Sequence, residues 1–265
     1  MWLESEGSDR PVPGEWIVSR LAWLRATLLE NDPRFRELHP RQFLEPESVY
    51  QAVLRGEHRE AVGVLCAKYG IDPERVRLDW RVETADEGVA AHVRSEPWGP
   101  IDVCVRERFR ANPLGFGVVL THELGHAYLT DMDVENGGTW EAEATTDLVT
   151  FVKGLGKLTV NGVDHLGHGQ KAGSRGYGYL NREAVVFAYA RTALDCAVPP
   201  AQAQAGLNPA VLGYLRVLEG EPGPLGRMFQ RIVSLFRRPA PRLDETEVAV
   251  DADGNLVDAR TGRRL

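Results

Sequence analysis

The sequence lacks the features that mark membrane and secreted proteins. No apolar run approaches the roughly 20 residues that a membrane-spanning helix needs. Its first residues are acidic and are not followed by an apolar stretch, so we expect no secretory signal. Cysteine is scarce: Cys66, Cys104 and Cys196 lie far apart, and none belongs to a CxxC pair. We therefore expect free thiols in a reducing, cytoplasmic compartment, and neither a disulfide framework nor a cysteine metal site.

Positive charge is also in short supply. Against 38 Asp and Glu the chain has 31 Lys and Arg, which gives a net charge of -7. This balance argues against a broad nucleic-acid-binding surface, so no nucleic-acid partner is expected. With 265 residues, 43% of them hydrophobic, the chain can bury a substantial core. We predict a flexible arm over 1–14, a single domain over 15–238 and a tail over 239–265.

Hydrophobic spacing predicts helices at both ends of the chain and a small sheet between them. Helical spacing and end signals indicate helices over 16–29, 46–54, 59–69, 113–129, 140–155, 182–197, 210–218 and 225–237. Strand patterns occur over 76–82, 88–93 and 101–105, and a hairpin is predicted over 248–257. The glycine-rich stretch 156–181 is predicted to be a long loop. Helices, then a sheet, then more helices make an α+β fold.

The predicted helix 225–237 combines an apolar face with a cluster of arginines. Leu225, Phe229 and Phe236 fall on one side, and the arginines add positive charge over 225–238. Two interpretations fit this segment. It packs on the domain with its arginines directed to solvent, which is the commoner role, or it contacts an anionic membrane or a partner protein.

One segment places two histidines and a glutamate at the spacing of a zinc-binding helix. His122, Glu123 and His126 form an HExxH pattern within the largely apolar stretch 114–129. Residues four apart on a helix differ by about 40° of rotation and about 6 Å of rise, so both imidazoles can reach one metal ion. Glu123 is then positioned to deprotonate a water molecule. An exposed helix with an incidental His–Glu pair fits the apolar surroundings less well.

A catalytic zinc site needs a third protein ligand. The pattern HExxHxxGxxH is excluded, because Leu129 and Met132 occupy its glycine and final histidine positions. A glutamate from the next predicted helix is the other solution, and that helix offers Glu141 and Glu143. The metal-binding pattern by itself leaves both glutamates open.

Over residues 100–155 the sequence resembles the gluzincin metallopeptidases, especially the small single-core forms called minigluzincins. In that group a helix after HExxH carries Glu-x-x-x-Asp, which Glu143 and Asp147 match. Thr145 stands at the same offset from Glu141. The resemblance implies that Glu143 is the third zinc ligand, that Asp147 holds a zinc-binding histidine, and that Glu141 is the fallback ligand.

The fold and cofactor implied by this resemblance are also specific. It implies one Zn²⁺ per chain and a zincin-like architecture. The expected elements are N-terminal helices, a small twisted sheet, the HExxH helix, the glutamate helix and further C-terminal helices. A peptide substrate is expected to add to an edge of the sheet, which the resemblance places near 101–105.

The activity implied by the resemblance is hydrolysis of a peptide or protein substrate, with Glu123 as general base. A later segment would supply oxyanion or substrate contacts, and its candidates are His165, His168, Tyr177 and Tyr179. Taken singly, each of these four is better explained as a packing or solvated residue. The alternative function is a zinc-binding scaffold or interaction protein with an inactive, peptidase-like site, and the intact Glu123 argues against it.

Overall fold

The computed structural model describes residues 12–38, 47–81, 90–134, 139–162, 180, 182–219, 248–250 and 256–258. They belong to two compact units, 1–215 and 216–265, which are described separately. The boundaries near residues 14 and 238 stay predictions. The predicted helix 225–237, with its arginine cluster, lies outside the described residues.

The first unit is α+β, mostly helical with one small sheet, as the sequence predicts. Its helices and strands, in chain order, are α1 (Gly14–Asn31), α2 (Pro33–Leu38), α3 (Glu47–Leu54), α4 (His58–Tyr69), β1 (Val76–Arg81), β2 (Ala91–Ser95), β3 (Ile101–Arg106), α5 (Pro113–Asp131), α6 (Trp140–Val152), α7 (Gly156–Gly162), α8 (Arg182–Asp195), α9 (Pro200–Gln204) and α10 (Pro209–Glu219), the last of which runs into the second unit. In the second unit, β4 (Val248–Val250) pairs antiparallel with β5 (Leu256–Asp258), which confirms the predicted hairpin.

The sheet has the order β1-β3-β2. β1 and β3 are parallel, with Val76 opposite Ile101, whereas β2 runs antiparallel to β3, with Ala91 opposite Val105. The expectation that 101–105 forms the edge of the sheet is therefore wrong, because β3 is paired on both sides. Among the described strands, β2 is the edge strand that packs against α5.

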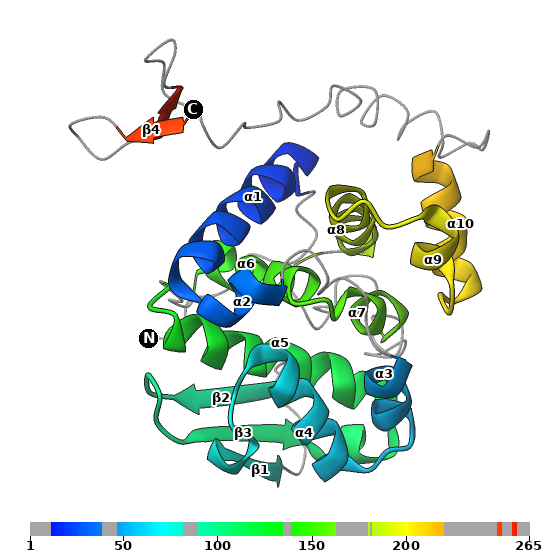
Figure 1. Cartoon of the computed structure of the whole chain (residues 1–265). Coiled ribbons are helices and arrows are strands. Elements are labelled where there is room, and N and C mark those ends of the chain that lie inside the picture. Colours follow the sequence, from blue (N-terminus) through cyan, green and yellow to red (C-terminus); the bar gives the residue numbers. More distant parts are fainter. Residues whose placement is uncertain are drawn as a thin grey trace. The chain divides into compact units, whose positions relative to one another are not determined.

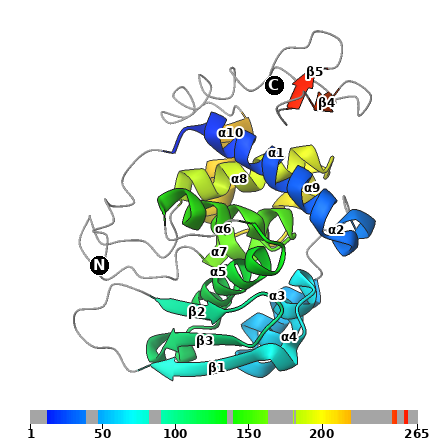
Figure 2. The ribbon, with the colours of Figure 1, turned by 90° about the vertical axis from the view of Figure 1, so that its left-hand side faces the viewer.

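Helix α5 lies at the centre of the first unit. It runs between the sheet on one side and α6 and α7 on the other (Figure 1, Figure 2). The Asn112 side chain caps it by accepting a hydrogen bond from the Gly115 amide at 3.0 Å, and Pro113 follows at the first helical position. Most of its residues are buried around the whole circumference, as expected of a helix covered on several sides.

A buried ion pair between Asp32 and Lys153 links the junction of α1 and α2 to the end of α6. Lys153, whose side chain is 2% exposed, lies with its Nζ 3.4 Å from Asp32 Oδ2. The Tyr128 hydroxyl donates to the same carboxylate oxygen at 2.6 Å. Burial lowers the pKa of Lys153 to about 8, although Asp32 favours its charged form. The contacts of Asp32 thereby join the end of α1 to α5 and to the end of α6.

The predicted loop over 156–181 is wrong at its start. Residues Gly156–Gly162 form α7, which buries Leu158 and Val160 completely. Glycines at both ends concealed a short helix that tertiary packing stabilises, despite the low helix propensity of glycine. The short helices α2 and α9 were also not predicted, because each spans less than two turns and is too short to show a helical repeat of apolar residues.

The state of the cysteines and the length of the helices relate to the compartment that the sequence predicts. All three cysteines are free thiols, and burial raises the pKa of Cys66 to about 12. Within the part of the chain that the structure describes, no helix is both long and apolar enough to cross a membrane.

Candidate metal centre

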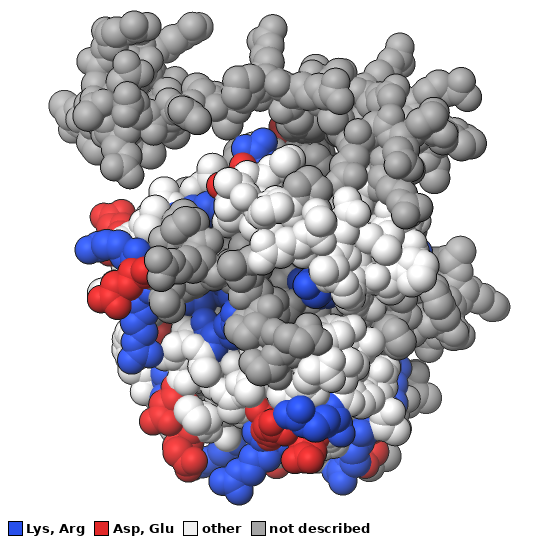
Figure 3. Space-filling model, turned by 45° about the vertical axis from the view of Figure 1, so that its right-hand side comes forward, with Lys and Arg blue, Asp and Glu red and all other residues white. Residues whose placement is uncertain are grey.

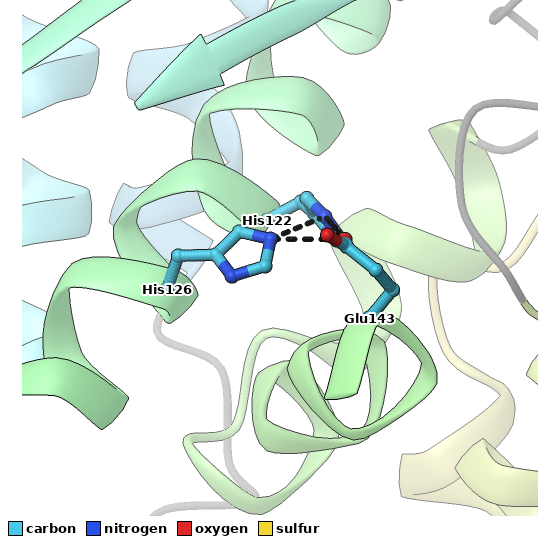
Figure 4. A group of neighbouring side chains, drawn as sticks. All are labelled: His122, His126 and Glu143. Atoms are coloured by element: carbon cyan, nitrogen blue, oxygen red, sulfur yellow. Dashed lines mark hydrogen bonds and ion pairs between the residues drawn. The ribbon is translucent and has the colours of Figure 1, made fainter. Parts of the chain in front are cut away.

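Three side chains from α5 and α6 converge on one point (Figure 4). His126 Nε2 lies 3.1 Å from His122 Nε2 and 3.0 Å from Glu143 Oε2. His122 Nε2 lies 3.2 Å from the same carboxylate oxygen. Among the described residues, this is the one group of three or more His, Cys, Asp and Glu side chains close enough to hold a metal ion.

A glycine between the two histidines allows α6 to approach α5 closely. A Cβ atom on Gly125 would lie only 3.1 Å from the Thr146 methyl and 3.2 Å from a Val149 methyl, so a larger residue would push α6 away. Thr139 starts α6 by accepting a hydrogen bond from the Ala142 amide at 3.2 Å. Together these contacts fix the glutamate helix beside the histidines.

The two candidate glutamates of α6 point in different directions. Residues two apart on a helix differ by about 200° of rotation, so Glu141 and Glu143 cannot face the same neighbour. Glu143 is half-buried against His122 and His126, whereas Glu141 is exposed. The structure thus brings Glu143 to the histidines and leaves the fallback residue at the surface.

The Nδ1 atoms of both histidines face acceptors on α6. His122 Nδ1 lies 2.8 Å from Asp147 Oδ1, and His126 Nδ1 lies 3.3 Å from Thr146 Oγ1. The other oxygen of Asp147 accepts a hydrogen bond from the Leu180 amide at 3.1 Å. Because an ionised carboxylate can only accept, His122 Nδ1 donates to Asp147, and Nε2 is the ring nitrogen that would bind a metal ion.

Charges within the group are strongly coupled. Burial opposes protonation of His122, but its hydrogen bonds to Asp147 and Glu143 outweigh burial and raise its pKa well above the ordinary value. Burial likewise disfavours an ionised Glu143, yet hydrogen bonds and charge from the two histidines lower its pKa to about 2. The arrangement therefore favours positive charge next to the Glu143 carboxylate, either from protons or from a cation.

Zinc fits this donor set by chemistry and by spacing. Zinc takes imidazole nitrogen and carboxylate oxygen, and donors at its usual bond lengths lie about 3.3 Å apart around a tetrahedral ion. The three donor–donor distances of 3.0, 3.1 and 3.2 Å are close to that value. His122, His126 and Glu143 would hold the ion and leave its fourth position open.

Glu123 adjoins the group without belonging to it. The residue is 7% exposed, and its carboxyl group interacts electrostatically with His122, His126 and Glu143. Burial raises the pKa of Glu123 above the ordinary value, although the two histidines oppose this effect. A carboxyl group with a raised pKa is suited to accept and return a proton near neutral pH.

The candidate oxyanion or substrate residues are not placed by the structure. His165, His168, Tyr177 and Tyr179 all lie outside the described residues. Two groups that do contact the site were missed by the sequence reading, namely the Thr146 hydroxyl and the Leu180 amide. The position of Thr146 immediately before Asp147 could have indicated the contact of its hydroxyl group. Nothing in the sequence indicates the contact of the Leu180 amide.

Charged side chains of both signs lie on and beside the sheet of the first unit. In the lower part of Figure 3, Lys and Arg lie among Asp and Glu. Ion pairs in this region include Arg77 with Asp102 at 4.0 Å and Arg110 with Glu107 at 2.8 Å. Mixed charge gives little general attraction for a polyanion. The absence of a nucleic-acid partner stays a prediction.

Comparison with known proteins gives no family for this chain. No protein-family model, curated protein or solved structure matches it. Any statement about function therefore depends on the geometry and chemistry of the site.

Proposed function

We propose that the protein is a zinc-dependent peptidase in which His122, His126 and Glu143 hold the metal and Glu123 is the general base. The observation that carries this proposal is the convergence of three zinc-type donor atoms from α5 and α6, with a buried carboxyl group beside them. Asp147 positions His122 through the hydrogen bond to its Nδ1. The free thiols are compatible with a cytoplasmic enzyme, which is part of the same proposal.

Each side chain has a distinct task in the proposed reaction. A zinc ion at this site would supply Lewis acidity, which polarises a carbonyl group and makes a water molecule more acidic. Glu123 accepts the proton of the attacking water and then delivers it to the nitrogen of the leaving amine. Asp147 accepts a hydrogen bond from His122 Nδ1, which leaves Nε2 to bind the metal ion.

The surrounding fold supports a zincin-like architecture as part of this proposal. The edge strand β2 is antiparallel to its neighbour and packs against the HExxH helix. Among the described strands β2 lies at an edge of the sheet, which is where an extended peptide can add through main-chain hydrogen bonds. We therefore place the substrate along Ala91–Ser95, in contrast to the sequence-based expectation for 101–105.

The competing function is a zinc-binding scaffold whose site performs no hydrolysis. It shares the metal ligands and the fold, so the two functions differ only in turnover. The intact, buried carboxyl group of Glu123 favours the enzyme, because burying a carboxyl group is costly and a scaffold gains nothing from one at that position.

Hydrolysis of a peptide library separates the two functions. We expect zinc-loaded protein to cleave library peptides, the products to disappear after removal of metal with a chelator, and cleavage to return on adding zinc. Mass spectrometry of the products gives the cleavage sites. Zinc-loaded protein that leaves the whole library intact would favour the scaffold.

A further inference from the structure

The second histidine of the site has its own contact on α6, separate from that of the first. His126 Nδ1 lies 3.3 Å from the Thr146 hydroxyl, which is completely buried. Thr146 directly precedes Asp147, whose carboxylate contacts His122. Two neighbouring residues of α6 therefore contact the two histidines of α5, but one offers a neutral hydroxyl and the other a carboxylate.

The hydrogen-bond directions around Thr146 follow from its second contact. Its Oγ1 lies 3.1 Å from the carbonyl oxygen of Ala142, one turn earlier on α6, and that oxygen can only accept. The single hydroxyl proton therefore goes to Ala142, and a lone pair of Oγ1 faces His126. Nδ1 of His126 must then be the donor to Oγ1, and Nε2, which faces Glu143 and His122, is the ring nitrogen that would bind a metal ion.

The orientation of the Thr146 side chain is fixed by packing. Its methyl group faces Gly125, where an added Cβ would lie 3.1 Å away. With the methyl held on one side by α5, the hydroxyl is turned toward His126. The methyl group of Thr146 therefore packs against α5, while its hydroxyl group contacts His126.

We propose that Thr146 is a positioning residue for His126. It fixes the tautomer with Nδ1 protonated and Nε2 free for the metal, and it adds no charge to a site that already has three nearby carboxyl groups. This inference rests on the proposed metal centre, and it concerns a residue that acts through His126 and touches neither metal nor substrate. Partners of this kind contribute about 10–100-fold to metal affinity.

Two substitutions distinguish the role of the Thr146 hydroxyl group from that of its methyl group. Thr146→Val removes the hydroxyl but keeps the branched shape and the methyl beside Gly125. Thr146→Ser keeps the hydroxyl and removes the methyl. We expect Thr146→Val to weaken the Kd for Zn²⁺ by about 10-fold, and Thr146→Ser to keep it within about 3-fold of wild type.

The melting temperature of the metal-free protein is the second measurement, because a purely structural role would appear there. Because only Thr146→Ser loses the methyl, its melting temperature should be lower than that of Thr146→Val. The order of the two variants in melting temperature is then the reverse of their order in zinc affinity. Zinc affinity that stays at the wild-type value in Thr146→Val, or that follows the melting temperature in both variants, overturns the inference. A wild-type protein that binds no zinc overturns the proposed function itself, which is a distinguishable result.

Discussion

Replacing Glu123 by Gln should lower the rate of peptide hydrolysis by about 10²–10⁴-fold while zinc stays bound. The amide has nearly the shape of the carboxyl group but cannot accept the proton of water at neutral pH. Because Glu123 lies outside the group of His122, His126 and Glu143, the Kd for Zn²⁺ should change little. The measurements are kcat/KM on a cleavable library peptide and zinc content of the same preparation.

Glu141→Gln is the matched control for this experiment. It makes the same chemical change at an exposed position two residues before Glu143, and we expect an unchanged rate. Hydrolysis that persists in Glu123→Gln at the wild-type rate would contradict the assigned general base. Loss of both zinc and activity would show instead that Glu123 supports the metal site.

Replacing Glu143 by Ala should weaken zinc binding more than any change outside the donor group. One of three converging donors is lost, so the effect should exceed the roughly 100-fold upper range for a residue that only orients a ligand. The measurement is the Kd for Zn²⁺ by competition with a chelating dye, together with the melting temperature of the metal-free protein to detect misfolding.

Glu141→Ala separates ligation from general electrostatics. It removes the same charge from the same helix, but from a side chain that is exposed and directed away from the histidines. We expect a Kd within about 3-fold of wild type, because exposed charges act weakly through solvent. Equal losses in the two variants would mean that net charge, and not coordination, explains the effect. A larger loss in Glu141→Ala would restore the fallback ligand.

The spacing of residues was enough to predict the geometry within single helices. The offset of four between His122 and His126 determines that they share a face of α5. The preference for Glu143 over Glu141 depends on the family pattern. In the structure, Glu143 Oε2 lies 3.0 Å from His126 Nε2. Both inferences depend on short-range regularity, which a sequence displays directly.

Relations between distant segments were predicted less well. Strand order depends on long-range pairing, so the sequence could not show that β3 is central and β2 is at the edge. The short helix α7 was hidden by glycines at its ends, because propensity is a weak guide where burial of Leu158 and Val160 decides the outcome. The donor to Asp147 is the main-chain amide of Leu180, and every residue except proline has such an amide. The sequence therefore does not indicate this contact.

Zinc content of the wild-type protein tests the central claim most directly. The protein should be purified without added metal and measured by mass spectrometry beside His126→Ala. We predict about one zinc ion per wild-type chain and a clear loss in the variant, as expected for a site with three protein ligands. A wild-type protein that contains no zinc, and takes up none when zinc is added, would contradict the account.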